Sequence, residues 1–592
     1  MTGFSKNNTN FTNKSVKIIT SLLNFFIVGI IVFSVIYYPA EQPAYVPAVG
    51  IKWYLLGGFV TIIITAFLNY LEKKTHYYEK LLLSIKNNRT SLLYIVAQLV
   101  ITGVFSVLAE LFLSHFVFGV STTGNFFNRY RYYFVWSCSF VFVYMLNIIY
   151  KRNVKTENMF AIIAIASGLV MIFSSPAGHT CWDVDSHYKY AIGLSSVRAN
   201  KTAAFDSIIE SHEEFNPNKT TAKESEELKK ILNENDRIET GTVLRVYSIP
   251  HIPAAICFSL GKLFGLSFVA KDCLARLINL LCYTLIVYSA LKKLKSSKII
   301  FMIIALFPTN IFLATNISYD WWVTSFMMLG TAYYLSEFQQ PEKRISTFDN
   351  WVMCGSLAIA CIPKQIYFPL MILPFFMKKN IFRIRKSEKT KYYSICIIAT
   401  ALLILSFMLR GFSSVNSGGD TRGGEDVNSF AQFNFILSSP LKYVGILLRF
   451  LVQYLSIPTT RSYICEFAYL HGSSGYLFVV SMLIIAIFTD KNEFDKKTSK
   501  WWLRAITIIV LFGTVSMIAT SLYISFTAVG SDEILGCQPR YIIPLLPSIL
   551  PIIGSCKITK FSNNYIYKSF FGIGTSVILF IGIYQAMILN ML

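Results

Sequence analysis

Residues 158–175 read NMFAIIAIASGLVMIFSS, a predominantly apolar run that contains no charged side chain. A helix of about 20 such residues crosses the roughly 30 Å hydrocarbon core of a bilayer. Similar runs recur along the chain, which is 54% hydrophobic and only 15% charged, whereas soluble domains are about 25% charged. The sequence therefore predicts an all-α polytopic integral membrane protein with about 13–16 transmembrane helices.

Candidate crossings before residue 158 lie near 17–40, 51–72, 91–116 and 130–150. Those that follow lie near 158–175, 272–292, 298–316, 319–338, 392–410, 474–489, 501–525, 541–556 and 568–591. This pattern divides the chain into two predicted parts. Residues 1–157 form an N-terminal four-helix membrane extension, to which the sequence assigns no function, and residues 158–592 form the membrane core.

The formal charge of +22 is distributed over short basic clusters between the apolar runs. They include Lys73-Lys74, Lys151-Arg152, Lys292-Lys293, Lys343-Arg344 and the segments 378–391 and 491–504. Basic clusters flank the cytoplasmic ends of membrane helices, so this charge favours a multi-pass protein of the cell membrane and argues against nucleic acid as a partner. The same rule places the N-terminus in the cytoplasm. It leaves 176–250, 411–440 and 526–540 as the large outer segments.

Three apolar stretches do not fit simple crossings. A full crossing at 251–267 would place the basic cluster that follows outside the cell, against the positive-inside rule. We therefore expect a surface or re-entrant helix on the outer side. The same argument places 440–457 along the outer surface. Residues 351–377 carry Pro363-Lys364 at their centre. Proline breaks helices, which predicts two short helices that meet at Lys364 near the outer face; a single kinked crossing is the alternative.

Acidic side chains occur at two outer turns. The first outer loop contains Asp183, Asp185 and His187 within five residues, directly after an apolar run. In a helix, Asp183 and His187 share one face. Asp320 lies in a short turn between two apolar runs. Charges beside a membrane boundary are costly to desolvate, which favours functional roles. The alternatives are a solvated loop with a helix cap at Asp183, and a cap on the following helix at Asp320.

Three outer cations are exceptions to the positive-inside rule: Lys364, Arg540 and Arg422, the last in a glycine-rich loop. Binding of an anionic phosphate would explain them, and snorkelling or pairing with a carboxylate is the alternative. The charged run 220–230 predicts a solvated helix that covers the site as a lid or spacer. The eleven cysteines show no paired spacing, so neither a disulfide framework nor a zinc site is indicated.

The order of these motifs resembles the GT-C class of membrane glycosyltransferases and, more narrowly, the bacterial family catalogued as domain of unknown function 2142. The matching motifs, in chain order, are Asp183 with His187, Tyr247–Pro253, Ala275–Asn279, Ile317–Asp320, Gly419–Arg422, the helix start at Pro440, and Gly536–Tyr541 through Pro544. They cover about residues 158–556. One departure is that the family's usual Asp-Glu pair reads Asp183-Val184 here, with the second carboxylate displaced to Asp185. The richness in Lys, Asn, Ile and Phe is typical of an AT-rich bacterial genome.

The resemblance implies a GT-C-like catalytic core that transfers a sugar from a polyprenyl-phosphate donor to a glycan or lipid-linked acceptor at the outer leaflet. It implies that Asp183, or else Asp185, is the general base that takes the proton of the acceptor hydroxyl. His187 and Asp320 would orient the acceptor or bind a metal. Arg540, Lys364 and Arg422 would stabilise the departing phosphate.

A divalent metal would be Mg²⁺ or Mn²⁺, because the candidate ligands Asp183, Asp185 and Asp320 offer hard oxygen atoms. Further candidate site residues from the matching motifs are Tyr247, His251, Arg276, Gln538 and Tyr541.

Three other functions compete with this interpretation. A transporter or flippase for lipid-linked sugars would place charges at the bilayer midplane and often shows repeat symmetry, whereas the polar residues here cluster at helix ends. An O-antigen polymerase or ligase handles similar lipids, but Arg and His of its large outer loops would dominate. A structural membrane protein needs none of these charges.

Overall fold

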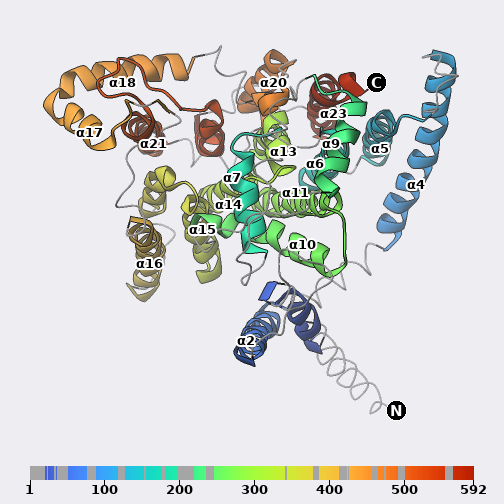
Figure 1. Ribbon diagram of the computed structural model, residues 1–592. Helices are drawn as coiled ribbons and strands as arrows, with labels where there is room; N and C mark the ends of the chain where they lie inside the picture. Colours follow the sequence, from blue (N-terminus) through green and yellow to red (C-terminus); the bar gives the residue numbers. More distant parts are fainter. Residues whose placement is uncertain are drawn as a thin grey trace.

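The computed structural model describes most of the chain from residue 51 to 591, together with parts of 21–36. Its longest gaps are 77–88, 118–126, 196–218, 235–245, 378–385, 412–422, 457–463, 491–499 and 554–563. Every regular element in these described residues is a helix (Figure 1). Eight of the helices are long and apolar enough to cross a membrane, or nine if one bent pair counts as a single span. The prediction of an all-α polytopic membrane protein is therefore confirmed.

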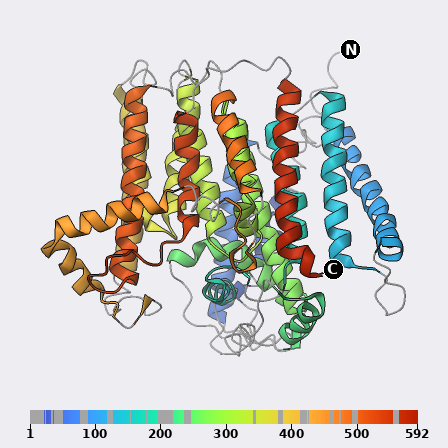
Figure 2. The ribbon, with the colours of Figure 1, turned by 90° about the horizontal axis from the view of Figure 1, so that it is seen from above.

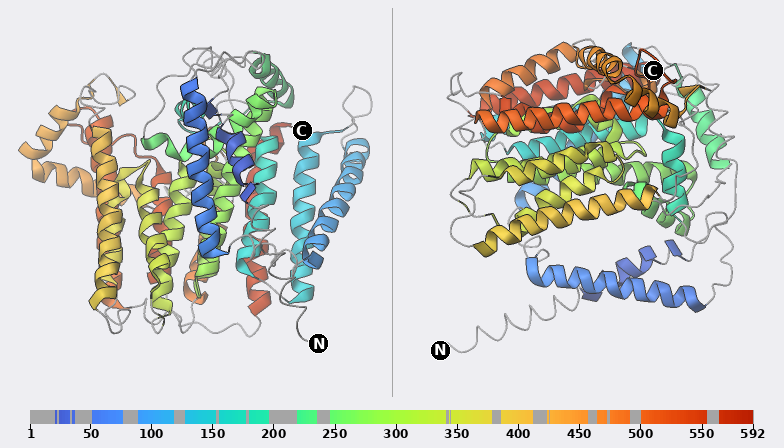
Figure 3. Two further views of the ribbon diagram at one scale, coloured as in Figure 1. Left: turned by 90° about the horizontal axis from the view of Figure 1, so that it is seen from below. Right: turned by 90° about the vertical axis from the view of Figure 1, so that its left-hand side faces the viewer.

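The long helices agree with predicted crossings in both parts of the chain. They are α2 (Ile51–Thr75), α4 (Arg89–Phe112), α5 (Arg129–Lys151), α6 (Thr156–Ser174), α11 (Phe268–Lys293), α16 (Lys386–Gly411), α21 (Trp501–Phe526) and α23 (Asn564–Ile583). The bundle that they form is seen from the side in Figure 2. Figure 1 and the right-hand view of Figure 3 show α2 beside the bundle, at the edge of the molecule. The crossing predicted near 17–40 lies largely outside the described residues.

Several other predicted crossings are shorter or broken helices. They are α12 (Lys298–Ala305), α13 (Pro308–Ala314), α15 (Thr347–Cys361), α20 (Tyr476–Thr489) and α22 (Leu546–Ile553). The run near 298–316 is interrupted at Phe307-Pro308, because proline cannot donate the hydrogen bond that would continue α12. α14 (Asp320–Gln339) has 20 residues but is less apolar than the spanning helices. Fewer described helices are therefore long and apolar enough to cross a membrane than the 13–16 that the apolar runs predict.

The basic residues near 292–298 and at 343 lie at one end of the bundle, which we call the basic end. Lys298 at the start of α12 pairs with Glu157 at the start of α6, with 3.3 Å between Nζ and Oε2. Lys293 at the end of α11 and Lys343 both approach Asp349 of α15, at 2.9 and 3.7 Å. The opposite end, the loop end, carries α7 (Val184–Leu194), α9 (Ala222–Glu234) and α10 (Ile252–Leu263), as Figure 2 shows.

The three irregular stretches are short, bent or 3₁₀ helices, and their predicted place on the outer side stays a prediction. α10 is only 12 residues long and packs on α11 and α7. α17 (Ser429–Ser438) and α18 (Pro440–Tyr454) meet at 107° and lie crosswise to α21 (Figure 2). After α15 the chain turns at Lys364 into a 3₁₀ helix, η3 (Gln365–Phe376). Tyr392 bonds both Asn350, near the start of α15, and Pro374, near the end of η3. The two segments are therefore antiparallel, and the turn at Lys364 lies at the loop end.

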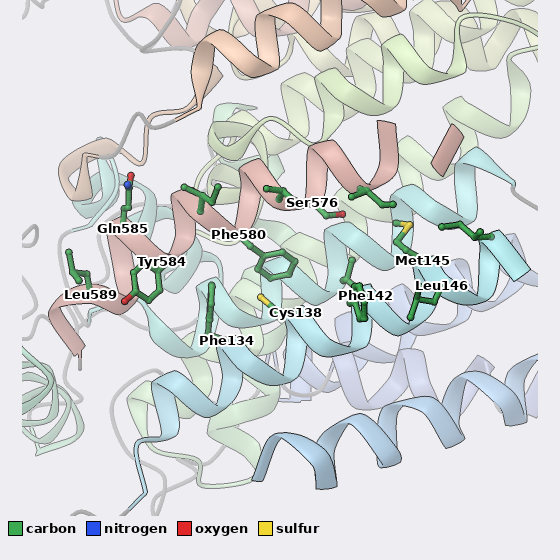
Figure 4. A pocket seen from close by; sticks show the side chains of 15 residues that line it. Phe134, Cys138, Phe142, Met145, Leu146, Ser576, Phe580, Tyr584, Gln585 and Leu589 are labelled. Carbon is green, nitrogen blue, oxygen red and sulfur yellow. The ribbon is translucent and has the colours of Figure 1, made fainter. Parts of the chain in front are cut away.

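The N-terminal extension joins the core through α5, which packs on α6 and α23. Arg131 at the start of α5 pairs with the fully buried Glu110 of α4, with 2.6 Å between Nε and Oε2. Between α5 and α23 lies an apolar groove of about 580 Å³ (Figure 4). Phe134, Phe142 and Phe580 line it, so its surface suits hydrocarbon.

Candidate functional site

Four charged side chains from distant parts of the sequence meet at the loop end. Arg540 Nη2 lies 3.1 Å from Asp183 Oδ2, and Arg540 Nε lies 3.3 Å from Asp320 Oδ2. Lys364 Nζ donates to Asp320 Oδ1 at 2.6 Å. We call these four residues the charged cluster. Their formal charges cancel, which offsets part of the cost of burying them.

The exposure of the two carboxylates differs. The side chain of Asp183 is 29% exposed, whereas that of Asp320 is 9% exposed and that of Arg540 only 1%. Asp183 is thus the carboxylate of the cluster that is accessible from the surface of the protein. Asp320 lies behind it and contacts both cations.

The turn before α14 fixes Asp320. Ser318 Oγ accepts a hydrogen bond from the backbone N–H of Asp320 and donates to its Oδ2. Asn279 of α11 donates to the backbone carbonyl of Asn316 at 3.0 Å, which ties this turn to a second helix. Asp320 is also the first residue of α14, where its negative charge complements the helix dipole. The capping role and the role in the cluster therefore coexist.

Asp183 occupies the N-cap position of α7, but its side chain makes no capping hydrogen bond. It turns toward Arg540 instead. Its φ of 53° is left-handed, a conformation that costs a non-glycine residue of order 1 kcal/mol and is common where function requires a fixed side chain. Asp183 therefore stands where the predicted helix cap would be, but its side chain does not cap the helix.

Arg540 lies on the 3₁₀ helix η8 (Pro539–Leu545), directly after the turn at Gly536. Gly536 has a φ of 76°, and a Cβ there would come within 2.5 Å of Phe526, so this turn needs glycine. The guanidinium of Arg540 stacks on Trp182 at 4.5 Å. Its Nη1 is buried and makes no hydrogen bond to any described residue, so Arg540 retains a spare donor.

Lys364 is enclosed by the rings of Tyr541 and Tyr319, whose centroids lie 4.0 and 5.1 Å from Nζ. Burial lowers the pKa of Lys364 to about 8, and the charge of Arg540 acts in the same direction, while Asp320 opposes both. Lys364 therefore loses its proton within a pH range that experiments can reach.

The chain matches the model of the family described as "Predicted membrane protein (DUF2142)" over residues 177–549, which is more than half of its length. The chain belongs to this family. The matched region contains the whole charged cluster and leaves α2, α4, α5 and α6 before it and α23 after it outside. No curated protein and no solved structure matches the chain.

Two histidines lie beside the cluster of this DUF2142 protein. His187 Nδ1 is 3.0 Å from His251 Nε2, and Tyr319 packs edge-on against His187 at 4.6 Å. Burial lowers the pKa of His187 to about 3 and that of His251 well below its ordinary value, so both rings are neutral at pH 7. His187 Nε2 makes no hydrogen bond to a described residue.

The predicted metal site does not fit these residues. Within the described part of the chain, no group of three His, Cys, Asp or Glu side chains is arranged to hold a metal. The oxygens of Asp320 are bonded by Lys364 and Ser318 and face Arg540, so cations of the protein occupy the place expected for Mg²⁺ or Mn²⁺. The side chain of Asp185 lies outside the described residues.

The other predicted site residues divide into three groups. Tyr541 contacts the cluster, since its ring covers Lys364, and Gln538 precedes it with a buried Oε1 that has no described partner. Arg276 instead joins helices: it donates to Thr315 O at 2.6 Å and Ser175 Oγ at 2.7 Å. The side chain of Tyr247 and all of Arg422 lie outside the described residues.

Sequence reasoning assigned no role in the site to Trp182, Tyr319 or Asp272. Trp182 and Tyr319 each directly precede a cluster carboxylate in sequence. The ring of Trp182 lies under the guanidinium of Arg540, and that of Tyr319 packs edge-on against His187. Asp272 accepts from Tyr188 of α7 and stands four residues before Arg276. An aspartate and an arginine at this spacing within an apolar helix are the signal that could have identified it.

We expect Asp320→Asn to lower the free energy of unfolding by about 3 kcal/mol, because two buried cations lose their common carboxylate. Asp183→Asn should lower it by less than about 1 kcal/mol, since this pair is partly exposed. Adding Lys364→Met to Asp320→Asn should restore part of the loss. Unfolding in detergent measures all three, and equal losses for Asp183→Asn and Asp320→Asn would contradict this division.

Proposed function

We propose that this protein is a GT-C-type membrane glycosyltransferase that moves a sugar from a polyprenyl-phosphate donor to a glycan or lipid-linked acceptor. The observation that carries the proposal is the contact between Asp183, which can be reached from outside, and Arg540, which keeps a spare buried donor. A general base and a phosphate-binding cation are the two groups that such a transfer needs. Both lie at the loop end of a membrane bundle, where a lipid donor can present its headgroup.

In the proposed reaction, the acceptor hydroxyl oxygen bonds to the anomeric carbon of the donor sugar, and the bond from that carbon to the phosphate oxygen breaks. The hydroxyl proton passes to Asp183. The bonding electrons leave with the polyprenyl phosphate, which gains a second negative charge. Attack opposite the leaving group inverts the anomeric carbon, as the resemblance to the GT-C class implies.

The charges of the cluster respond to this proton transfer. At rest, two carboxylates balance Lys364 and Arg540. Once Asp183 is protonated, Arg540 loses one partner and the cluster carries one net positive charge. That charge appears as the departing phosphate becomes more negative, so the attraction is stronger in the transition state than in the ground state. Asp320 acts as a positioning residue, because it holds Lys364 and Arg540 next to each other.

The competing functions explain less of this geometry. A transporter would place its charges near the middle of the spans, yet all four cluster residues lie at helix starts or turns at the loop end. An O-antigen polymerase or ligase remains the nearest alternative, since it would use the same lipid phosphate. The number of sugars transferred per turnover distinguishes it: one for the proposed enzyme and an oligosaccharide block for a polymerase or ligase.

The positive-inside rule gives the orientation that the proposal needs. We infer that the basic end faces the cytoplasm of a bacterial cell, as does the N-terminus, and that the charged cluster faces the extracytoplasmic side. The donor sugar is then used at the outer leaflet.

Cysteine labelling of intact cells tests this orientation. We expect Glu227→Cys, on the exposed face of α9, to react with a membrane-impermeant maleimide above the background of the wild-type cysteines. Lys343→Cys, exposed at the basic end, should react only after the cells are opened. The reverse pattern would place the cluster in the cytoplasm.

Asp183→Asn should lower the rate of transfer from a radiolabelled polyprenyl-phosphate sugar by about 10²- to 10⁴-fold, because it removes the general base. Asp185→Asn is measured beside it to separate the two carboxylates. Asp532→Asn, an exposed residue outside the cluster that pairs with Lys442, serves as the matched control and should keep wild-type turnover. Full turnover by both folded variants, Asp183→Asn and Asp185→Asn, would refute the assignment of the base.

The pKa of Lys364 predicts how the reaction depends on pH. Lys364 binds phosphate only when protonated, so kcat/KM should fall as the pH rises through about 8. Lys364→Arg keeps its charge at higher pH and should move this decline upward by at least one pH unit. A wild-type alkaline decline that is unchanged in Lys364→Arg would show that another group causes it.

A further inference from the structure

A pocket of about 570 Å³ lies between α9 and α11 at the loop end. Its polar rim includes Lys229 and Lys230 of α9 and Ser267 before α11, and its apolar floor includes Phe173 of α6 with Leu274 and Leu277 of α11. None of these residues belongs to the charged cluster. The pocket also adjoins the two features to which the proposed transfer gives no role, the charged helix α9 and the N-terminal extension.

The floor of the pocket is apolar surface that the fold leaves uncovered. Phe173 is 41% exposed and Leu274 is 40% exposed. They stand at the loop ends of α6 and α11, two of the helices that can span a membrane. A site of this size that joins apolar surface to a few polar groups is typical of small-molecule sites. At the end of a membrane span, the molecule that can supply apolar chain to such a floor is a lipid.

The rim of the pocket is cationic. Glu226 is its one acidic residue among those described, and that carboxylate is paired with Arg129 of α5 and with Lys229, the latter at 3.1 Å. Two cations thus pair with this carboxylate. Lys230 is exposed at the rim. This excess of positive charge beside apolar surface complements a phosphate group on a lipid.

The N-terminal extension fixes this rim. Tyr130 of α5 donates its hydroxyl to Glu226 Oε1 at 2.6 Å and accepts a hydrogen bond from Lys229 Nζ at 3.1 Å. Two turns further along α9, Asn233 Oδ1 accepts from the backbone N–H of Val269 at 3.0 Å. Because α9 is held at two places along its length, its lysines are arranged before any ligand arrives, which lowers the entropy lost on binding.

We propose that this pocket binds the phosphate headgroup of an anionic lipid, with the phosphate between Lys229 and Lys230 and the chain over Phe173, Leu274 and Leu277. The proposal does not depend on the glycosyl transfer at the charged cluster. It gives the extension a function, which is to hold the wall of a lipid site that the core alone would leave incomplete.

Native mass spectrometry of the purified full-length protein tests the proposal. Dioleoyl phosphatidic acid is the probe, and dioleoyl phosphatidylcholine, which has the same chains and a zwitterionic headgroup, is the control lipid. Lys230→Glu should weaken binding of phosphatidic acid about 10-fold, and Lys230→Gln less. Lys223→Glu is the matched control, since it makes the same charge change at an exposed position of α9 outside the pocket. It should change binding by less than about 2-fold.

Competition with excess inorganic phosphate distinguishes a lipid site from a site for phosphate alone. Because the proposed site also holds the lipid chain, inorganic phosphate should not displace phosphatidic acid. Wild-type binding by both Lys230 variants would overturn the proposal, as would equal loss in Lys223→Glu or displacement by inorganic phosphate. Activity is not part of the readout, so a failure here is separate from a failure of the proposed transferase.

Discussion

The guanidinium of Arg540 between two carboxylates is the interaction on which the loop end depends. An unpaired buried cation costs several kcal/mol, so Arg540 is tolerated only while α7 and the start of α14 both reach it. Lys364 has the same requirement through Asp320. These contacts therefore bring together the first outer loop, the turn before α14, the α15–η3 turn and η8, which are up to 357 residues apart in sequence.

Much of the site's membership could be predicted from the sequence, for a simple physical reason. A charge next to an apolar run incurs a desolvation cost, so Asp183, Asp320, Lys364 and Arg540 are conspicuous in the sequence itself. Their pairing could not be predicted, because sequence gives no distance between separate loops. The metal assignment shows this limit: oxygen ligands suggested a cation, and among the described residues the cations beside Asp320 are Lys364 and Arg540.

The fold shows the same limit. Apolar runs indicate that a segment is buried in lipid or protein, but composition does not distinguish one long helix from two short ones. The run near 298–316 becomes α12 and α13, whereas the run near 272–292 becomes the single helix α11. For α10 and the α17–α18 pair, hydrophobicity alone would predict crossings, whereas the order of the basic clusters along the chain predicts helices that stay on the outer side.

α11 lines the proposed lipid pocket and also contacts α7, the helix that begins beside Asp183 of the charged cluster. Asp272 faces α7 through Tyr188, while Leu274 and Leu277 face the pocket under α9. Arg276, on the same helix, is bonded to Thr315 and Ser175, so α11 is fixed to its neighbours at this level. A helix held in this way keeps the two sites at a constant separation. Under the two proposals, the charged cluster and the pocket under α9 each bind a lipid-borne phosphate at the same surface of the bilayer, one for the chemistry and the other for anchoring.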